Sequence, residues 1–290
     1  MALKQFAAPY RLVDSGNGRK LEQFGPFLID RPAAAAVWRP ALASVAWAEA
    51  HAVFSRQRGN RWSFRQSLPP DWCVAVDGLK FRVAPTPFGH LGVFPEHATT
   101  WRAVDRCVRH WLEGNPGQRP HVLNLFAYSG GATLAALRAG AAVCHLDASR
   151  PMVSRARENA CLNNLGDGDV RWLIDDVRRF LKREIGRSRR YHGIVLDPPT
   201  YGRGTRQEVF KVEHDIGLLL DNCRTVLVEE PLFVLLTSHT PTFTPTVLRN
   251  LLTQSLPHRA GAAIDAGELA IAGQPGTYDL PSGSYAFWHG

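Results

Sequence analysis

The segment from Val122 to Gly131 constrains the fold more than any other, because a short apolar run ends in small residues and a helical pattern follows at once. This order predicts a strand, a tight turn and a helix N-terminus. Such a turn places unpaired backbone N–H groups and the positive end of the helix dipole at the carboxyl edge of a sheet, where nucleotide-like ligands bind. An ordinary strand-to-helix connection is the alternative.

Strand and helix patterns alternate regularly from His121 onward, which is typical of a parallel sheet covered on both faces. The expected strands are residues 122–127, 142–146, 170–174, 194–196 and 232–236. The expected helices are residues 131–139, 151–164, 177–185, 212–228 and 245–256, with an earlier one containing Trp101 to Trp111. Residues 268–272 and 285–288 are expected to close one sheet edge as an antiparallel pair. The sequence therefore predicts a doubly wound α/β fold.

The beginning of the chain has a different pattern, in which short apolar runs alternate with turn residues. Gly and Asn between residues 14 and 18, and Asp77-Gly78 within residues 72–83, predict hairpins. Between them, the stretch Ser55–Arg65 interleaves arginines with two aromatics, as in loops that contact phosphates and stack on bases; a solvated loop is the alternative. We expect a small β-rich N-terminal extension over residues 1–86, as a possible RNA-contact region, and the main domain over residues 87–290.

The composition narrows the kinds of binding partner and the cellular compartment that we expect. The formal net charge of +8 and the pI near 9.6 favour a polyanionic partner such as RNA. The five cysteines have no paired short spacing, which argues against a zinc site or a disulfide framework and fits a reducing cytoplasm. Without a signal pattern or an apolar run of about 18 residues, we expect a soluble protein with no membrane partner and no bound metal. The sequence does not predict the oligomeric state.

Acidic residues follow successive strands next to the glycine turn. Asp147 closes the second predicted strand, and Asp175 and Asp176 follow the third. A carboxylate at Asp147 could accept hydrogen bonds from both hydroxyls of a ribose, and one at Asp176 could accept from an adenine amino group. Each aspartate alone is more often a helix N-cap, but their joint placement favours a nucleoside site.

A rigid segment, Leu196–Gly202, follows the fourth predicted strand. Pro198 and Pro199 fix the backbone there and remove two donors, so the segment presents the Asp197 carboxylate and bare carbonyl oxygens, with Tyr201 nearby for stacking. Acceptors fix the edge of a flat polar ring, and an aromatic face holds its plane. A simple Pro-Pro turn is the alternative.

Five motifs in order carry a family resemblance: Asn124–Gly131, Leu146–Ser149, Ala156–Ala160, Asp175-Asp176 and Asp197–Gly202. Together they resemble the class I S-adenosylmethionine-dependent methyltransferases, which have a seven-stranded sheet. More narrowly, they are similar to the branch that modifies large-subunit ribosomal RNA at cytosine carbon 5 or guanine nitrogen 7. The resemblance covers roughly residues 85–240.

The resemblance implies that S-adenosylmethionine packs against the glycine turn, with Asp147 on the ribose and Asp176 on the adenine. The implied cofactor-binding residues are Phe94, Glu96, His97, Asn124, Phe126, Tyr128, Ser129, Gly130, Asp147, Ala148, Ser149, Asn159, Asp175, Asp176 and Asp197. The rigid segment after the fourth predicted strand supplies the predicted catalytic residues, which are Asp197, Pro198, Pro199 and Tyr201. Asn124, Phe126 and Tyr128 depart from the general glycine signature, and Glu96-His97 departs from the cofactor-closing loop of this branch.

One departure bears on the reaction. Carbon-5 cytosine enzymes use a cysteine after the fifth strand, where this chain has Thr237-Ser238-His239. Without a nucleophile, a pyrimidine carbon 5 is too electron-poor to take a methyl group, whereas a nitrogen lone pair can attack directly. We therefore expect methyl transfer to a base nitrogen of ribosomal RNA, in rRNA processing. The alternatives are a nicotinamide-dependent oxidoreductase and a non-catalytic RNA-binding protein.

Overall fold

The structure is a computed structural model that describes residues 8–57, 59–204, 208–257, 259 and 261–290. The chain forms two compact units, one of Met1–Ala98 with Ala270–Ser282 and the other of Thr99–Leu269 with Gly283–Gly290. The domain boundary expected at residues 86 and 87 rests on motif content and stays a prediction.

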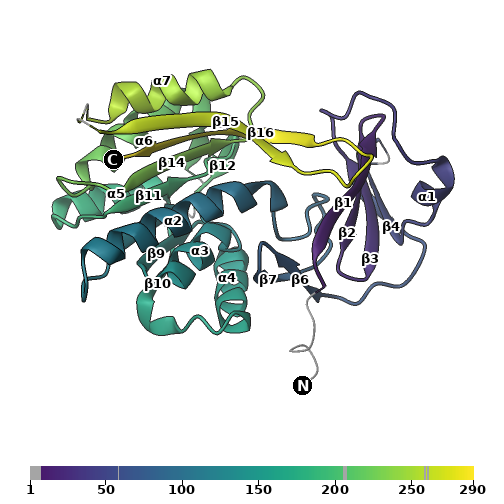
Figure 1. Ribbon diagram of the computed structural model, residues 1–290, viewed down its shortest axis with the longest axis horizontal. Coiled ribbons are helices and arrows are strands. Elements are labelled where there is room, and N and C mark those ends of the chain that lie inside the picture. Colours follow the sequence, from purple (N-terminus) through teal and green to yellow (C-terminus); the bar gives the residue numbers. More distant parts are fainter. Residues whose placement is uncertain (1–7, 58, 205–207, 258, 260) are drawn as a thin grey trace. The chain divides into compact units, whose positions relative to one another are not determined.

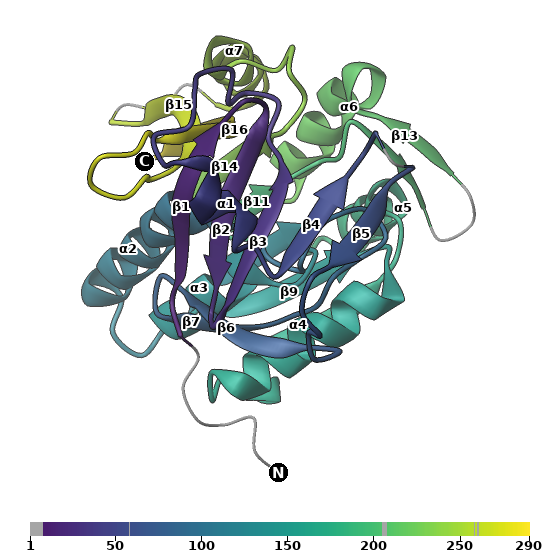
Figure 2. The same ribbon diagram turned by 90° about the vertical axis from the view of Figure 1, so that its right-hand side faces the viewer.

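The first unit contains a five-stranded sheet in the order β1-β2-β3-β4-β5 (Figure 2). Its elements are β1 Tyr10–Gly16, β2 Arg19–Phe24, β3 Phe27–Pro32, α1 Ser44–Ala48, β4 Ala52–Ser55, β5 Arg61–Phe64, β6 Trp72–Val76, β7 Leu79–Val83 and the 3₁₀ turn η1 Pro95–His97. The hairpin predicted around Asp77-Gly78 is confirmed, and both residues have positive φ, as its tight turn requires. The expected turn at residues 14–18 is shorter, because the first three of these residues extend β1.

The stretch Ser55–Arg65 is not a loop, as the sequence suggested, but largely a hairpin. Ser55 pairs with Arg61 where β4 meets β5, and β5 is the edge strand of the sheet. The alternation of Trp62 and Phe64 with polar residues is a strand period, which the interleaved arginines obscured. Arg58, part of the predicted RNA contact, lies outside the described residues.

The second unit contains a seven-stranded sheet in the order β10-β9-β8-β11-β14-β16-β15. Its strands are β8 His121–Leu125, β9 Ala142–Asp147, β10 Val170–Ile174, β11 Gly193–Leu196, β14 Phe233–Ser238, β15 Ala263–Ile271 and β16 Leu280–His289. Neighbouring strands from β10 to β14 are parallel, and β16 is antiparallel to β14. The predicted seven-stranded α/β fold is confirmed, and the closing strands are longer than expected.

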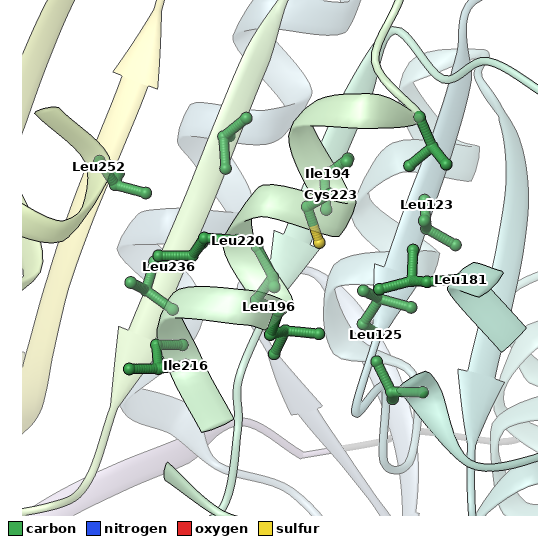
Figure 3. Packing of buried hydrophobic residues seen from close by; sticks show 14 of the residues in the cluster. Leu123, Leu125, Leu181, Ile194, Leu196, Ile216, Leu220, Cys223, Leu236 and Leu252 are labelled. Carbon is green, nitrogen blue, oxygen red and sulfur yellow. The ribbon is translucent and has the colours of Figure 1, made fainter. Parts of the chain in front are cut away.

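Helices cover both faces of this sheet, with α2, α3 and α4 on one side and α5, α6 and α7 on the other (Figure 1). They are α2 Ala98–Gly114, α3 Gly131–Ala139, α4 Arg150–Leu162, α5 Val177–Gly186, α6 Val212–Thr225 and α7 Pro245–Ser255, with the 3₁₀ turn η2 Asp167–Asp169 and a small hairpin of β12 Tyr201–Arg203 and β13 Val209–Lys211. Figure 3 shows the larger core, where leucines of β8, β11 and β14 pack against α5, α6 and α7.

Apolar residues at helical spacing turn each helix toward this core. In α5, Val177, Phe180 and Leu181 are buried at positions i, i+3 and i+4. Asp176 caps the first turn of this helix, and Thr244 caps α7. All five cysteines are free thiols. Within the described residues, every helix falls short of the length and apolarity that crossing a lipid bilayer requires.

Candidate active site

The turn between β8 and α3 has an unusual backbone. Phe126 and Tyr128 have φ angles of +55° and +49°, in the left-handed region, and Gly130 has +93°. Residues other than glycine are strained in this region because of their Cβ atom, so they persist there only where neighbouring contacts hold them. The Ala127 N–H donates to the Leu146 carbonyl at 3.0 Å, which ties the turn to β9. The turn that the sequence predicted is therefore present, and two aromatic residues supply its positive φ angles.

Asp147, at the end of β9, holds this turn. Its two carboxylate oxygens accept one backbone N–H each, from Tyr128 and from Ser149, both at 2.8 Å. Burial raises the pKa of Asp147, and among the described residues no basic side chain pairs with it. Each carboxylate oxygen has two lone pairs, so both keep an acceptor position. Asp147 can thus receive two further hydrogen bonds from neutral donors, such as neighbouring hydroxyls, with Ala148 and Ser149 beside it.

A buried polar network lies beneath the turn. The Asn124 side-chain amide donates to the Thr133 hydroxyl at 2.9 Å, and that hydroxyl lies 2.9 Å from His145 Nδ1. Burial lowers the pKa of His145 to about 3, so the ring is neutral near pH 7. Asn124, predicted to bind the cofactor, directs its amide into this network. Sequence analysis missed Thr133 and His145, although both are polar residues within otherwise apolar patterns.

The helix α4 supports the other end of the turn. The buried Asn159 side chain donates to the Ser129 carbonyl at 2.9 Å. At Gly130 an added Cβ would lie 3.1 Å from the Ala156 Cβ, so the turn and α4 are in close contact. These contacts place the predicted residues Ser129, Gly130 and Asn159 together and give Asn159 a positioning role at the turn.

The two acidic residues after β10 differ in their surroundings. Asp176 accepts the Arg179 N–H at 3.1 Å as the N-cap of α5, and its second oxygen lies 3.5 Å from Arg178. Asp175 accepts hydrogen bonds from the guanidinium groups of Arg179 and Arg183. Although its partial burial acts to raise the pKa of Asp175, these arginines hold it below the ordinary value. The structure thus commits Asp175 to arginines, and the cofactor contacts of both residues stay predictions.

The hairpin of β12 and β13, which sequence analysis missed because its strands are short, is fastened to α5 and to the turn. Arg179 pairs with Glu208 at 3.0 Å, and the Arg178 guanidinium lies 6.0 Å from the Phe210 ring. The Phe210 ring in turn lies 5.3 Å from the Phe126 ring of the turn. The strand that carries Tyr201 is therefore held beside the β8–α3 turn.

The segment after β11 presents Asp197 at the same edge of the sheet. The Thr237 hydroxyl lies 2.7 Å from Asp197 Oδ1 and 3.2 Å from the Leu196 carbonyl oxygen, which links the ends of β11 and β14. His239 Nε2 lies 3.9 Å from the same carboxylate oxygen. Pro198 is buried, Pro199 is exposed, and the Tyr201 side chain is 52% exposed. Thr237 is a further residue that sequence analysis missed.

Three predicted cofactor-binding residues belong to the first unit. Phe94 precedes η1, and its ring lies edge-on to the His97 ring at 6.4 Å. Glu96 is buried, and its Oε2 has no hydrogen-bond partner among the described residues. The cofactor contacts of these residues stay predictions.

Comparison with known proteins identifies the family of this chain. A family model described as S-adenosylmethionine-dependent methyltransferase matches residues 45–255. The crystal structure of a SAM-dependent methyltransferase from Agrobacterium tumefaciens is 35% identical, with a TM-score of 0.89, over 98% of this chain and 91% of that one. The chain belongs to the S-adenosylmethionine-dependent methyltransferase family.

Curated relatives in this family are longer. The ribosomal RNA large subunit methyltransferase K/L of Methylococcus capsulatus is 31% identical over 178 residues, which are 60% of this chain and 23% of the relative. The ribosomal RNA large subunit methyltransferase K of Neisseria meningitidis is 26% identical over 162 residues, 55% of this chain and 43% of the relative. The chain thus spans about a quarter to less than half of the length of these relatives.

The residues of the turn fit S-adenosylmethionine, the cofactor of this methyltransferase family. The two open acceptor positions of the half-buried Asp147 carboxylate match the two ribose hydroxyls. Membership of the family confirms the predicted resemblance to S-adenosylmethionine-dependent methyltransferases and contradicts the nicotinamide-dependent oxidoreductase. The roles of the individual residues remain predictions.

Replacing Asp147 with alanine is expected to weaken cofactor binding on the order of ten- to a hundredfold, because charge-assisted hydrogen bonds contribute about 1.5 to 3 kcal/mol. Calorimetric titration with S-adenosylhomocysteine measures the affinity. Asp221→Ala, which removes an exposed carboxylate from α6, is the matched control and should bind normally. Unchanged affinity in a folded Asp147→Ala variant would contradict the assignment.

Replacing Thr133 with valine keeps the shape of the side chain but removes the hydroxyl between Asn124 and His145. We expect the free energy of unfolding to fall by about 1 to 3 kcal/mol, because two buried polar groups lose their partner. Urea denaturation measures the change, with the exposed Thr246→Val in α7 as control. Equal stability of the two variants would show that the network contributes nothing.

Proposed function

We propose that this methyltransferase transfers the methyl group of S-adenosylmethionine to a base nitrogen of RNA, and of ribosomal RNA in particular. The names of the relatives from Methylococcus capsulatus and Neisseria meningitidis support ribosomal RNA as the substrate. The formal net charge of +8 favours a polyanionic partner. A cytoplasmic site of action, which the cysteine usage favours, agrees with this substrate.

The observation that carries the proposal is the Asp197 carboxylate, fixed by Thr237 at the carboxyl ends of β11 and β14. A carboxylate accepts hydrogen bonds from amino or ring N–H groups, so Asp197 orients the base edge. Tyr201, with its exposed ring, stacks on the base and holds its plane. Positioning of the nitrogen in line with the donor is the main catalytic effect expected of these residues.

The cysteines support a nitrogen acceptor. β14 ends with Thr237 and Ser238, and His239 follows it, so this position offers no thiol. Cys223 lies in α6 among the packed core leucines, and burial raises its pKa far above the ordinary value (Figure 3). A buried, protonated thiol is a poor nucleophile. The sulfonium group of S-adenosylmethionine supplies an electrophilic methyl group that a nitrogen lone pair accepts without a covalent enzyme intermediate.

The hairpin of β4 and β5 is the proposed RNA contact in the first unit. Arg56 and Arg61 are exposed there, and the rings of Trp62 and Phe64 are stacked with an interplanar angle of 19°. Phe64 is 53% exposed. Arginines that neutralise phosphates and an exposed ring that stacks on bases are the combination by which single strands are bound.

The direct test is incubation of the enzyme with labelled S-adenosylmethionine and ribosomal RNA, followed by nucleoside analysis. We expect a nucleoside methylated on nitrogen. We also expect Asp197→Ala to lose most of the turnover while it still binds the cofactor, because the carboxylate positions the acceptor. Asp221→Ala on α6 is the matched control. A 5-methylcytosine product, or a covalent adduct with RNA that carries 5-fluorocytosine, would overturn the nitrogen assignment.

Neutralising Arg58 and Arg61 is expected to weaken RNA binding and to flatten its dependence on salt, because fewer counterions are released on binding. Each lost phosphate contact reduces the slope of log affinity against log salt by about 0.7 on a single strand. Fluorescence anisotropy across a salt series measures the slope. If the variant keeps the wild-type slope, the hairpin is only a solvated surface.

A further inference from the structure

A pocket of about 450 Å³ lies at the amino ends of β8, β9 and β10. This is the edge of the parallel sheet opposite the β8–α3 turn, since the turn follows the carboxyl end of β8. Its lining includes His121, Arg171, Ser188, Arg189 and Arg190, with Asp169 at the end of η2. Neither the family resemblance nor the proposed reaction uses these residues.

The backbone that carries the arginines is fixed. After α5 the chain makes a turn in which Ser188 has a φ of +52°, and the Ser188 N–H donates to the Ile185 carbonyl at 3.0 Å. The Arg189 N–H donates to the Glu184 carbonyl at 3.0 Å. Both bonds satisfy carbonyls at the helix end. The positions of consecutive arginines are thereby set before any ligand binds.

A fully buried carboxylate organises the floor of this region. Glu184 accepts a hydrogen bond from the Tyr191 hydroxyl at 2.6 Å and pairs with Arg171 at 3.2 Å and with Arg187 at 3.3 Å. Although burial acts to raise the pKa of Glu184, these donors hold it below the ordinary value, so the group stays charged. Arg171 is thus fixed on one side and keeps further N–H donors, since a guanidinium has five.

Positive charge is in excess around the pocket. Asp169 pairs with Arg119, and Glu184 pairs with Arg171 and Arg187. Arg189 and Arg190 are exposed, and the Arg190 guanidinium donates to the Arg189 carbonyl at 3.0 Å. Among the residues that the structure describes, no carboxylate pairs with either arginine. Arg189 and Arg190 thus carry two guanidinium groups without a neutralising carboxylate, and Arg171 adds a third that Glu184 holds in place. Such a set of donors matches the oxygen atoms of a phosphate group better than those of a neutral ligand.

We propose that this pocket is a second binding site, separate from the active site, and that it takes phosphate groups. The phosphate comes either from the backbone of the RNA, beyond the nucleotide that is methylated, or from a free phosphorylated small molecule. Arg171, Arg189 and Arg190 bind its oxygens, and Glu184 acts as the positioning residue that fixes Arg171. The site goes beyond the proposed reaction, because phosphate binding here requires no methyl transfer.

The test compares two double variants of the full chain that remove the same charge. Arg189→Gln with Arg190→Gln removes from the pocket the two guanidinium groups that have no carboxylate partner among the described residues. Arg106→Gln with Arg249→Gln removes exposed arginines from α2 and α7 and is the matched control. Each protein is titrated with a labelled 20-nucleotide single-stranded RNA across a salt series, and by calorimetry with sodium tripolyphosphate and with S-adenosylhomocysteine.

If the phosphate belongs to RNA, the pocket variant loses about 1.4 from the salt slope while the control keeps it, because two phosphate contacts are lost. If the ligand is a free phosphorylated molecule, tripolyphosphate binds the wild type and the control, and binding to the pocket variant falls on the order of tenfold or more. The affinity for S-adenosylhomocysteine stays unchanged in both variants.

Equal behaviour of the pocket and control variants with both probes would overturn the proposal. This outcome is independent of the proposed function, because a wild-type enzyme that fails to methylate ribosomal RNA can still bind phosphate in the pocket. Conversely, the wild-type enzyme could methylate a nitrogen while the two double variants bind RNA and tripolyphosphate equally. That result would support the proposed reaction and contradict the second site.

Discussion

The hydrogen bond from the Tyr128 N–H to Asp147 is the interaction on which the candidate active site depends. Two non-glycine residues of this turn, Phe126 and Tyr128, have left-handed φ angles, which persist only where other contacts compensate for their strain. The carboxylate at the end of β9 supplies such a contact and also bonds the start of α4 at Ser149. One side chain thereby fixes the turn and keeps two open acceptor positions, which we predict the ribose of the cofactor uses.

A buried network of polar side chains, which would destabilise an apolar core if they lacked partners, supports the β8–α3 turn. Asn124, Thr133 and His145 are buried between β8, α3 and β9 and satisfy one another, except for His145 Nε2, which has no partner among the described residues. A turn with two aromatic residues at left-handed φ angles needs rigid support, and a hydrogen-bonded network supplies it with more directional specificity than apolar packing. The neutral state of His145 keeps an extra charge away from the cofactor site.

The two edges of the parallel sheet have opposite chemical character. At the carboxyl edge, the carboxylates of Asp147, Asp176 and Asp197 offer hydrogen-bond acceptors. At the amino edge, Arg171, Arg189 and Arg190 offer donors around a pocket. This separation follows from the fold, since strand ends of one direction gather at each edge. The predicted cofactor site and the proposed phosphate site therefore use different side chains.

The sequence by itself determined the fold class, the family and the order in which the site motifs follow successive strands. These depend on local periodicity and on motifs that are contiguous in the chain. It placed Asp147, Asp176 and Asp197 at strand ends from spacing alone. It could not find Thr133, His145 or Thr237, whose partners lie 9 to 41 residues away and meet only when strands align. Tertiary structure also decided that Ser55–Arg65 is a hairpin, that Asp175 is committed to arginines, and that the arginines after α5 share a pocket with β10. Hydrogen bonds and ion pairs between distant segments have no local sequence period, so only the folded chain shows them.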